Sequence, residues 1–558
     1  MCGIFAIFNQ DKQNLLYQKK YDALIRHNFM KGKSRGPEKN TLLKKNGDYI
    51  GFHRLAINGF GNDESEQPLK KHNCILICNG EIYNWKHLGK ISKSNCTTSS
   101  DCEIILDLYI KYGIKQTLQM LDGVFAFILY DQTKNQVFVA RDTYGVRPLF
   151  MCYQEDHTST SDKLTSLFFA SEMKSINDIC SFQENNRNHE MTINNPFIKN
   201  QFPPGHYVVF SSKLYNTYIH PVKYSQCNSF QTNISKDHFT LIRDSLINAV
   251  AKRVDNTDRE IACLLSGGLD SSLIAGLVVY ISKMRFNKPP STIHTWSIGM
   301  TGSQDLKFAK NVADFLGTTH HSIELTEKDF LDAIPHVIYA IESDDTTTIR
   351  ASVGNWLISK FIRENSNAKV IFNGDGSDEV TGGYLYFHAA PDAIEFDKEC
   401  RRLLSDIHYY DVLRSDRCIA SHGLEPRTPF LDRGFVQTYL SIPMEDRCHN
   451  IKNKCEKYLL RKAFSDMDII PNEVLWRRKE AFSDGVSTST KSWFEVIQEF
   501  AQTQNPMLSG LEAENKYYKD IYQKHYGNFK AVPYKWMPKF VEATDASART
   551  LKFYKNEL

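Results

Sequence analysis

The sequence predicts two domains of different fold class, an α+β sandwich followed by an α/β domain with a doubly wound parallel sheet. Its 558 residues are too many for one hydrophobic core and suit two or three domains. Short alternating or apolar runs dominate up to about Tyr207, whereas helical stretches alternate with buried strands from about Asp237. We therefore expect a first domain over residues 1–207, a linker over 208–236 and a second domain over 237–558.

Short runs separated by turns indicate the first domain. Strands are expected at residues 4–8, 74–78, 124–130, 136–140 and 167–170. Between them, residues 101–111 have helical periodicity, and this mixture is typical of packed antiparallel sheets. From residue 180 to about 236 the chain is rich in Asn, Ser, Gln and Tyr, which indicates the last strands and then a linker.

Alternating strands and helices indicate the second domain. Apolar runs at residues 259–265, 292–298 and 369–372 each end in a loop that carries glycine, and each has a helical stretch beside it. This alternation predicts a parallel sheet, and ligands of such sheets bind at the carboxyl ends of the strands.

Composition argues against several kinds of partner. A net charge of +3 is too small to favour nucleic acid or an anionic membrane. No apolar run reaches the roughly 18 residues that cross a bilayer, and the sequence starts without a hydrophobic signal segment. The thirteen cysteines form no CxxC pair and no zinc spacing, which favours reduced thiols. We therefore expect a cytoplasmic protein.

Cys2 is the first candidate for chemistry. Removal of Met1 leaves its thiol beside a free α-amino group, whose pKa of about 8 suits a general base. The alternative is a small apolar residue that starts a strand. Asn79 and Gly80 follow a buried strand and can form an oxyanion hole, although a plain turn also explains them.

Charged residues of the same domain suit an amino-acid substrate. Arg54 can hold a carboxylate through two parallel hydrogen bonds, and Glu81 and Asp101 can accept from an α-ammonium group. A surface ion pair is the alternative for each of them.

Together these residues resemble the class II, or N-terminal nucleophile, glutamine amidotransferases. The resemblance covers most of the first 200 residues, and its segments are Cys2-Gly3-Ile4, Arg35-Gly36-Pro37, Arg54-Leu55, Asn79-Gly80-Glu81-Ile82-Tyr83-Asn84, Ser100-Asp101 and Arg141-Asp142. It implies an N-terminal nucleophile sandwich in which Cys2 is the nucleophile and Asn79 with Gly80 stabilises the tetrahedral oxyanion. The residues that it implies for glutamine binding are Arg54, Asn79, Gly80, Glu81 and Asp101. Ser34 stands where the family usually has histidine.

Residues 266–272 (Ser-Gly-Gly-Leu-Asp-Ser-Ser) indicate a second site, between an apolar strand and a helical stretch. Glycines let backbone amides approach a phosphate, and a helix N-terminus adds a favourable dipole. A turn without a ligand is the alternative. The Walker pattern that ends in Gly-Lys-Ser/Thr is absent, which argues against transfer of the γ-phosphoryl group.

This string resembles the pyrophosphate loop of ATP pyrophosphatases, which cleave ATP between the α- and β-phosphates. The rest of the second half resembles the asparagine synthetase family, in segments 296–299, 347–352, 376–379, 429–432, 476–485, 536–538 and 547–549. The resemblance implies that the side-chain carboxylate of aspartate attacks MgATP and that ammonia from glutamine attacks the resulting β-aspartyl-AMP. A shielded passage for ammonia is expected, and a homodimer is expected because members of the family are often dimers.

The resemblance also implies roles in the second site. Asp270 and Asp378 would hold Mg²⁺ against the polyphosphate, Lys479 would neutralise developing charge, and Asp375 would take part in catalysis. The residues that it implies for ATP binding are Leu265, Ser266, Gly267, Gly268, Asp270, Ser271, Ile298, Asn373 and Gly374. Those expected near the bound substrates are Thr347, Thr348 and Arg350.

Two acidic positions of the second half depart from the asparagine synthetase pattern. Asp375 stands where glutamate is common, and Asp344 stands where an aromatic residue is usual. Because a displacement of ~1 Å can remove much of a catalytic rate, Asp375 leaves open a weakly active regulatory or scaffold protein. An amidotransferase for another carboxylate and a β-lactam synthetase-like ligase are also open. The presence of Cys2 argues against the last, which needs no glutaminase chemistry.

Overall fold

A computed structural model of the chain describes residues 2–9, 15–45, 47–156, 163–186, 197–211, 220–225, 237–452, 454–487 and 491–551. The chain forms two compact units, Met1–Gln226 and Cys227–Leu558. Most of the expected linker over 208–236 lies outside the described residues, and its first four residues continue a strand of the first unit. In the part of the chain described, no helix is long and apolar enough to cross a bilayer.

Two six-stranded sheets form the first unit, and all pairings between their strands are antiparallel. The first sheet has the order β10 (Ile198–Gln201), β8 (Phe150–Asp156), β9 (Lys163–Ala170), β1 (Gly3–Asn9), β3 (Asp48–Arg54), β2 (Lys39–Lys45). The second has the order β12 (Val222–Lys223), β11 (His206–Ser211), β7 (Gln136–Arg141), β6 (Gly123–Asp131), β5 (Cys74–Ile82), β4 (Leu69–Lys71).

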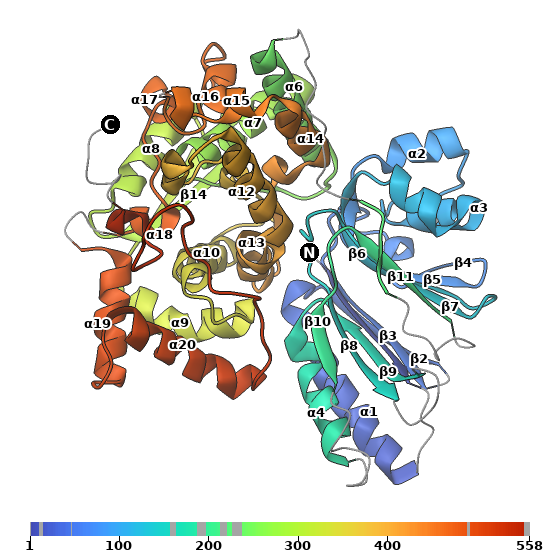
Figure 1. Ribbon diagram of the computed structural model, residues 1–558. Coiled ribbons are helices and arrows are strands. Elements are labelled where there is room, and N and C mark those ends of the chain that lie inside the picture. Colours follow the sequence, from blue (N-terminus) through green and yellow to red (C-terminus); the bar gives the residue numbers. More distant parts are fainter. Residues whose placement is uncertain are drawn as a thin grey trace. The chain divides into compact units, whose positions relative to one another are not determined.

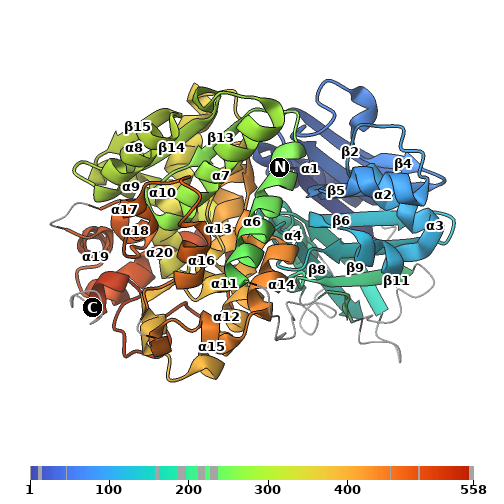
Figure 2. The same cartoon turned by 90° about the horizontal axis from the view of Figure 1, so that it is seen from above.

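The two sheets pack face to face around an apolar core. Successive residues of a strand point to opposite faces, so Ile4 of β1 meets Ile77 of β5 in this core. The outer face of the second sheet packs through Phe127 against α2 (Trp85–Ser92) and α3 (Glu103–Met120), which lie over β5 and β6 in Figure 2. On the first sheet, Phe5 packs edge-on against Phe29 of α1 (Leu15–Met30), which contacts α4 (Asn177–Asn186). The first unit is thus a four-layered sandwich.

A five-stranded parallel sheet, of which Figure 1 labels the strand His294–Met300, forms the core of the second unit. Its order is β15 (Thr319–Leu325), β14 (His294–Met300), β13 (Ile261–Leu264), β16 (Val370–Phe372), β17 (Glu425–Arg427). The chain adds β14 and β15 on one side of β13, and then β16 and β17 on the other. The order therefore reverses between β13 and β16, and in open α/β sheets such a reversal is where ligands bind.

Helices cover both faces of this sheet. Ile298 faces Gly354 of α10 (Thr346–Asn365), whereas a side chain at the next position, Gly299, would meet Leu306 of α8 (Gln304–Leu316). The other helices are α6 (His238–Asp255), α7 (Leu269–Phe286), α9 (Glu327–Ile341), α11 (Ser377–Thr381), α12 (Ala393–Asp406), α13 (Asp411–Ala420), α14 (Arg433–Ser441), α15 (Met444–Arg447), α16 (Tyr458–Phe464), α17 (Asn472–Leu475), α18 (Phe482–Gly485), α19 (Trp493–Gln504) and α20 (Gly510–Tyr526). The prediction of a doubly wound parallel sheet is confirmed, as is that of the antiparallel sandwich before it.

Candidate active sites

Cys2 stands at the entrance to β1 and is partly buried. Its thiol donates to the carbonyl oxygen of Leu55 at 3.6 Å. Arg35 fixes the main chain, because its Nε donates to the carbonyl oxygen of Cys2 at 3.0 Å. The guanidinium also pairs with Glu172 at 3.2 Å, and both of these side chains are buried. A buried ion pair therefore holds the candidate nucleophile in place.

His53, which lies opposite Gly3 in the sheet, does not supply a general base. Its Nε2 is hydrogen-bonded to the carbonyl oxygen of Phe29, and its Nδ1 is hydrogen-bonded to the side-chain amide of Asn40. Burial lowers the pKa of His53 to about 4, so the ring is neutral at pH 7. The α-amino group of Cys2 remains the base that we expect.

Asn79 offers an unpaired amide inside the first unit. Its side chain is buried on β5, and neither its oxygen nor its nitrogen has a hydrogen-bond partner among the described residues. Gly80 follows, where a Cβ atom would lie 2.4 Å from the carbonyl oxygen of Val124. A buried amide without a partner is costly, and the cost is recovered when a ligand supplies the missing partner. The arrangement suits the oxyanion of a tetrahedral intermediate.

The three charged residues expected at glutamine all lie close to this strand or to the segment 54–59. Arg54 donates to a main-chain carbonyl of the following turn at 2.9 Å. Glu81 is buried and accepts from Nδ2 of Asn58 at 2.8 Å, a contact that no sequence pattern indicated. Asp101 is also buried and accepts from the amide of Ile82 at 2.6 Å. These contacts hold both carboxylates at the end of β5.

Arg141 and Asp142, which belong to the amidotransferase resemblance, stabilise a loop. The guanidinium of Arg141 donates to the carbonyl oxygens of Gly145, Arg147 and Phe202 at 2.6–2.9 Å. The carboxylate of Asp142 accepts from main-chain amides of the same loop. Both side chains are buried, so their role here is structural.

The loop after β13 begins the second candidate site. Oγ of Ser271 accepts from the amide of Ser266 at 3.1 Å, and the hydroxyl of Ser266 accepts from the amide of Gly268 at 3.4 Å. Helix α7 starts immediately afterwards at Leu269. The loop is thus held by its own hydroxyl groups, and it brings a helix N-terminus to the place where the sheet order reverses. This is a favourable position for phosphate.

Gly267 shapes this loop but does not line the cavity beside it. It has a φ of +73°, and a Cβ atom would lie 2.5 Å from the amide nitrogen of Ala309. Its carbonyl oxygen accepts from Arg477 at 3.0 Å, and Arg477 pairs with Asp305 at 2.8 Å. Glycine is therefore needed for the turn and for close packing against α8.

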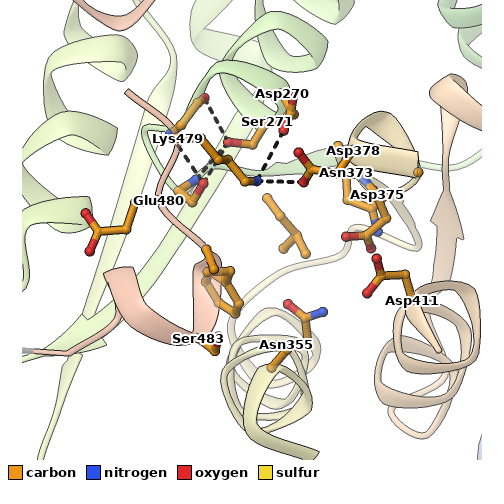
Figure 3. A pocket seen from close by; sticks show the side chains of 18 of the residues that line it. Asp270, Ser271, Asn355, Asn373, Asp375, Asp378, Asp411, Lys479, Glu480 and Ser483 are labelled. Carbon is orange, nitrogen blue, oxygen red and sulfur yellow. Dashed lines mark hydrogen bonds and ion pairs between the residues drawn. The ribbon is translucent and has the colours of Figure 1, made fainter. Parts of the chain in front are cut away.

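A cavity opens at the carboxyl ends of β13, β14 and β16 (Figure 3). The loop after β16 touches the loop after β13, because a Cβ atom on Gly374 would lie 2.8 Å from the backbone of both Asp270 and Ser271. Oγ of Ser377 also donates to Oδ1 of Asp270 at 2.8 Å. The predicted residues that line this cavity are Leu265, Ser266, Gly268, Asp270, Ser271, Ile298, Asn373, Gly374, Asp375, Asp378 and Lys479.

Apolar residues form one end of the cavity. Leu265 and Ile298 both line it, and the amide of Leu265 donates to the carbonyl oxygen of Trp296 at 2.8 Å. Nε1 of Trp296 is buried and has no partner in the described chain, and its ring stacks on His321 with centroids 4.0 Å apart. A flat apolar wall with an unpaired donor suits an aromatic base with acceptor nitrogens.

Two lysines and two carboxylates form a charged cluster beside the phosphate loop. Nζ of Lys457 lies 2.6 Å from Asp270 and 2.6 Å from Asp378, and Nζ of Lys479 lies 2.6 Å from Asp378. Figure 3 shows Lys479 beside Asp270 and Asp378, with a dashed line to each of the two carboxylates. Burial lowers the pKa of Lys479, but the two carboxylates outweigh burial and hold it above the usual range. Burial raises the pKa of Asp270, yet the lysines bring it below its usual value.

Asp270 and Asp378 fit the chemistry of Mg²⁺. Each contributes hard carboxylate oxygens, and the shared contact with Lys457 places the two groups within reach of one cation. Over the described residues, no group of three His, Cys, Asp or Glu side chains could hold a metal ion. Mg²⁺ is usually bound by one or two carboxylates together with substrate phosphates and water, so two carboxylates are sufficient.

A second cluster lies at the other side of the cavity. The hydroxyl oxygen of Tyr384 lies 2.5 Å from a carboxyl oxygen of Glu379 and 2.7 Å from one of Asp411. Arg414 pairs with Asp411 at 2.7 Å and with Asp375 at 3.3 Å. Burial raises the pKa of Asp375 and of Glu379, whereas Arg414 outweighs burial at Asp411 and keeps its pKa below the usual range. Oδ2 of Asp375 has no hydrogen-bond partner in the described residues.

Arg350 lies away from the cavity, contrary to its expected place near the substrates. Thr347, Thr348 and Ala351 line the cavity from the first turns of α10, but the helical period directs Arg350 to another face. There it is buried, and its guanidinium pairs with Glu514 at 2.5 Å and with a second carboxylate at 2.6 Å. The sequence pattern did not indicate several residues that do line the cavity: Tyr384, Tyr410, Asp411, Arg414 and Lys457.

Comparison with known proteins finds a family match in each of the two units. Residues 1–223 match the family described as a glutamine amidotransferase domain, and residues 241–395 and 391–541 match the asparagine synthase family. The asparagine synthetase [glutamine-hydrolyzing] of Cricetulus griseus is 41% identical over 597 residues, and that of Homo sapiens is 40% identical over 596 residues. Each comparison covers 100% of this chain and 99% of the relative. The chain belongs to the family of glutamine-hydrolysing asparagine synthetases.

Proposed function

We propose that this protein converts aspartate to asparagine with ATP, and takes the ammonia from glutamine. Membership of the family supports both half-reactions. The observation that carries the proposal is the cluster of Asp270, Asp378, Lys457 and Lys479 beside the phosphate loop, where the sheet order reverses. Two carboxylates and two ammonium groups at a helix N-terminus suit a magnesium-bound polyphosphate.

In the first half-reaction, the thiolate of Cys2 attacks the carboxamide carbon of glutamine. Asn79 and Gly80 stabilise the resulting oxyanion, and the buried unpaired amide of Asn79 supports this role. The α-amino group of Cys2 transfers a proton to the leaving nitrogen, so ammonia departs and a thioester remains. Water then hydrolyses the thioester to glutamate and restores the thiol.

Glutamine is held in the same unit by charged side chains. Arg54 binds its α-carboxylate, because a guanidinium pairs with a carboxylate through two hydrogen bonds. Glu81 and Asp101 accept from its α-ammonium group, and their fixed positions at the end of β5 support this role. Hydrogen bonds from the protein keep both carboxylates oriented before the substrate binds.

In the second half-reaction, a side-chain oxygen of aspartate attacks the α-phosphorus of ATP, and pyrophosphate leaves. Main-chain groups near Leu265 and Ile298 receive adenine, and the loop containing Ser266, Gly268 and Ser271 receives the phosphates. Ammonia then attacks the acyl carbon of β-aspartyl-AMP, and AMP leaves as asparagine forms. Lys479 neutralises the charge that develops on the α-phosphate, since it stays protonated between two carboxylates.

Asp375 is suited to accept the proton that the attacking nitrogen loses. Its pKa is raised by burial, which makes the carboxylate a better base, and its Oδ2 is directed to no other partner in the described chain. Asp375 is one methylene shorter than glutamate, and Arg414 at 3.3 Å restrains it at the edge of the cavity. These features favour an active synthetase over a scaffold.

We propose Mg²⁺ as the ion that accompanies ATP, held by Asp270 and Asp378. When bound, it neutralises polyphosphate charge and orients the departing pyrophosphate. The scattered cysteines, of which the twelve in the described residues are free thiols, support a reducing compartment, for which we propose the cytoplasm. A homodimer remains our proposal for the assembly.

Aspartate-dependent release of pyrophosphate tests the proposed function. The full chain is incubated with MgATP and ammonia, with and without aspartate, and pyrophosphate and asparagine are measured. We expect both products only when aspartate is present. Pyrophosphate release that another carboxylate supports and aspartate does not would overturn the proposed substrate.

A further inference from the structure

The part of the cavity lined by Tyr384 and Asp411 has a wall formed by the last part of the chain. Trp536 lines the cavity together with Tyr384 and Asp411. These two belong to the second cluster described above, which we call the acidic cluster. Its ring centroid lies 5.6 Å from that of Tyr384, whose hydroxyl contacts both Glu379 and Asp411. We use the name C-terminal segment for residues 534–549, which follow α20 and form no regular helix or strand before residue 548.

The neighbouring carboxylates of Asp344 and Asp345 hold this segment next to Trp536. The amide of Trp536 donates to Oδ1 of Asp345 at 3.0 Å. Oδ2 of Asp345 caps α10, because it accepts from the amide of Thr348 at 3.0 Å, and Thr348 itself lines the cavity. The preceding residue, Asp344, pairs with Lys535 at 2.9 Å. The start of α10 and the wall of the cavity are thus positioned by one two-residue loop.

Further contacts join the C-terminal segment to the loop that carries Lys479. Arg549 pairs with Glu480 at 2.9 Å and donates to the carbonyl oxygen of Asp484 at 2.9 Å. Oγ of Ser547 donates to Oδ1 of Asp484 at 2.8 Å. One segment therefore contacts both sides of the cavity, the acidic cluster through Trp536 and the Lys479 loop through Arg549.

We propose that the C-terminal segment completes the binding site for the acceptor amino acid, with Trp536 as its wall and the Asp344–Lys535 ion pair as its positioning contact. The inference rests on the proposed function, since aspartate must bind at this end of the cavity. Asp344 replaces the aromatic residue expected at this position, and its partner Lys535 directly precedes Trp536 in the chain. Removal of the pair shifts Trp536 and weakens the binding of aspartate more than that of ATP.

The ion pair between Asp344 and Lys535 affects the position of Trp536 more than the stability of the fold. The side chains of Asp344 and Lys535 are 21% and 44% exposed, and pairs between such exposed groups contribute little to stability. The hydrogen bond from the amide of Trp536 to Asp345 involves neither side chain of the pair. Reversing one charge of the pair therefore tests the position of Trp536 in a protein that still folds. Exchanging both charges restores an attractive pair and should rescue the binding of aspartate.

The test measures the KM for aspartate and for ATP by ammonia-dependent pyrophosphate release from the full chain. We expect Trp536→Ala to raise the KM for aspartate by about tenfold or more, and Trp536→Phe to raise it less, because part of the ring wall remains. Asp344→Lys and Lys535→Asp should each raise the KM for aspartate by about threefold or more, and the double exchange should restore it. The KM for ATP should change by less than about twofold in all of them.

Lys328→Glu is the matched control, because Lys328 forms an exposed ion pair with Asp332 on α9 and does not line the cavity. It should leave both KM values unchanged. If the wild-type protein uses aspartate and the charge variants and Trp536→Phe keep its KM, the inference is wrong, even where Trp536→Ala fails to fold. If the wild-type protein releases no pyrophosphate with aspartate, the proposed function fails and the inference fails with it.

Discussion

Nζ of Lys457 lies 2.6 Å from Oδ2 of Asp270, the carboxylate of the phosphate loop at residues 266–272. The lysine side chain is almost fully buried, and its backbone has a φ of +59°. A left-handed conformation costs a non-glycine residue about 1 kcal/mol. Room for the side chain comes from Gly383, where a Cβ atom would lie 2.0 Å from Cε of Lys457. From the strain and close packing at this lysine, we infer that its charge acts on the phosphates, and the next prediction tests this.

Lys457→Met should lower the rate of aspartate-dependent pyrophosphate release by roughly 10²-fold, because a preorganised cation is lost where charge develops. Glutamine hydrolysis, which belongs to the other unit, should be unaffected. Lys462→Met, at an exposed position of α16, is the control and should behave as the wild-type protein. A Lys457→Met protein with normal synthetase activity would show that the contact with Asp270 is only structural.

Asn79→Ala should reduce kcat for glutamine hydrolysis by about 10²–10³-fold, since it removes a donor to the oxyanion. The KM for glutamine should change little, because the substrate amide gains this contact mainly in the transition state. Initial rates of glutamate formation measure both constants, and ammonia-dependent asparagine formation serves as the control for folding. A raised KM with an unchanged kcat would contradict the role in the oxyanion hole.

Asp375→Asn should lower ammonia-dependent asparagine formation by about 10²-fold, because an amide does not accept the proton from the attacking nitrogen. Asp375→Glu keeps the carboxylate and should retain most of the activity. Release of pyrophosphate should suffer less than formation of asparagine in Asp375→Asn, since the proton is lost only in the second step. Equal loss of both products would place Asp375 in substrate binding instead.

The raised pKa of Asp484 predicts that the stability of the second unit depends on pH. Burial raises the pKa of Asp484 to about 6, against an ordinary value of 3.8, although Ser547 and Arg549 partly oppose the shift. The unfolded chain therefore releases this proton near pH 4 and the folded chain near pH 6. The contribution of the group to the free energy of unfolding falls by about 3 kcal/mol between these pH values and stays low above them.

Urea unfolding of the wild-type protein and Asp484→Asn at pH 4 to 7 measures this contribution. We expect the free energy of unfolding of the wild-type protein to fall relative to that of Asp484→Asn as the pH rises from 4 to 6, and the difference to stay constant above pH 6. Asp520→Asn, in an exposed ion pair of α20, should show no such difference from the wild-type protein. A wild-type curve that runs parallel to that of Asp484→Asn would exclude the raised pKa.

Local pattern was sufficient to predict the order of most elements around the sites. Residues 74–78 and 259–265 are short apolar runs followed by Asn-Gly and by Ser-Gly-Gly, and both correspond to buried strands that end at a candidate site. The sequence predicts a helix over residues 101–111. The observed helix, α3, is longer, because it begins at Glu103 and continues to Met120 past the non-helical Gly113. The hydrophobic period and the turn residues of such runs lie within the runs themselves. They can therefore be predicted as strands or helices without information on tertiary contacts.

Other features depend on tertiary contacts that no local pattern contains. β15 carries four polar residues at its start and forms a strand because β14 pairs with it along seven residues. Lys457 and Arg414 are single charged residues, and a lone charge is usually a solvated surface group. Arg350 lies within a segment of the family resemblance, yet only the direction of its helix face shows that it is buried against Glu514. The fold brings these residues to their partners from more than 150 positions away in some cases, as with Lys457 and Asp270 (|i−j| = 187).

Comparison of Cys2→Ala with the wild-type protein, with glutamine or ammonia as nitrogen source, tests the two-site account most directly. Asparagine and pyrophosphate are measured with MgATP and aspartate in both cases. We predict that Cys2→Ala loses asparagine formation from glutamine and keeps the wild-type rate with ammonia. Glutamine-dependent asparagine formation by Cys2→Ala would contradict the assignment of the nucleophile, and the absence of ammonia-dependent product from the wild-type protein would contradict the synthetase site.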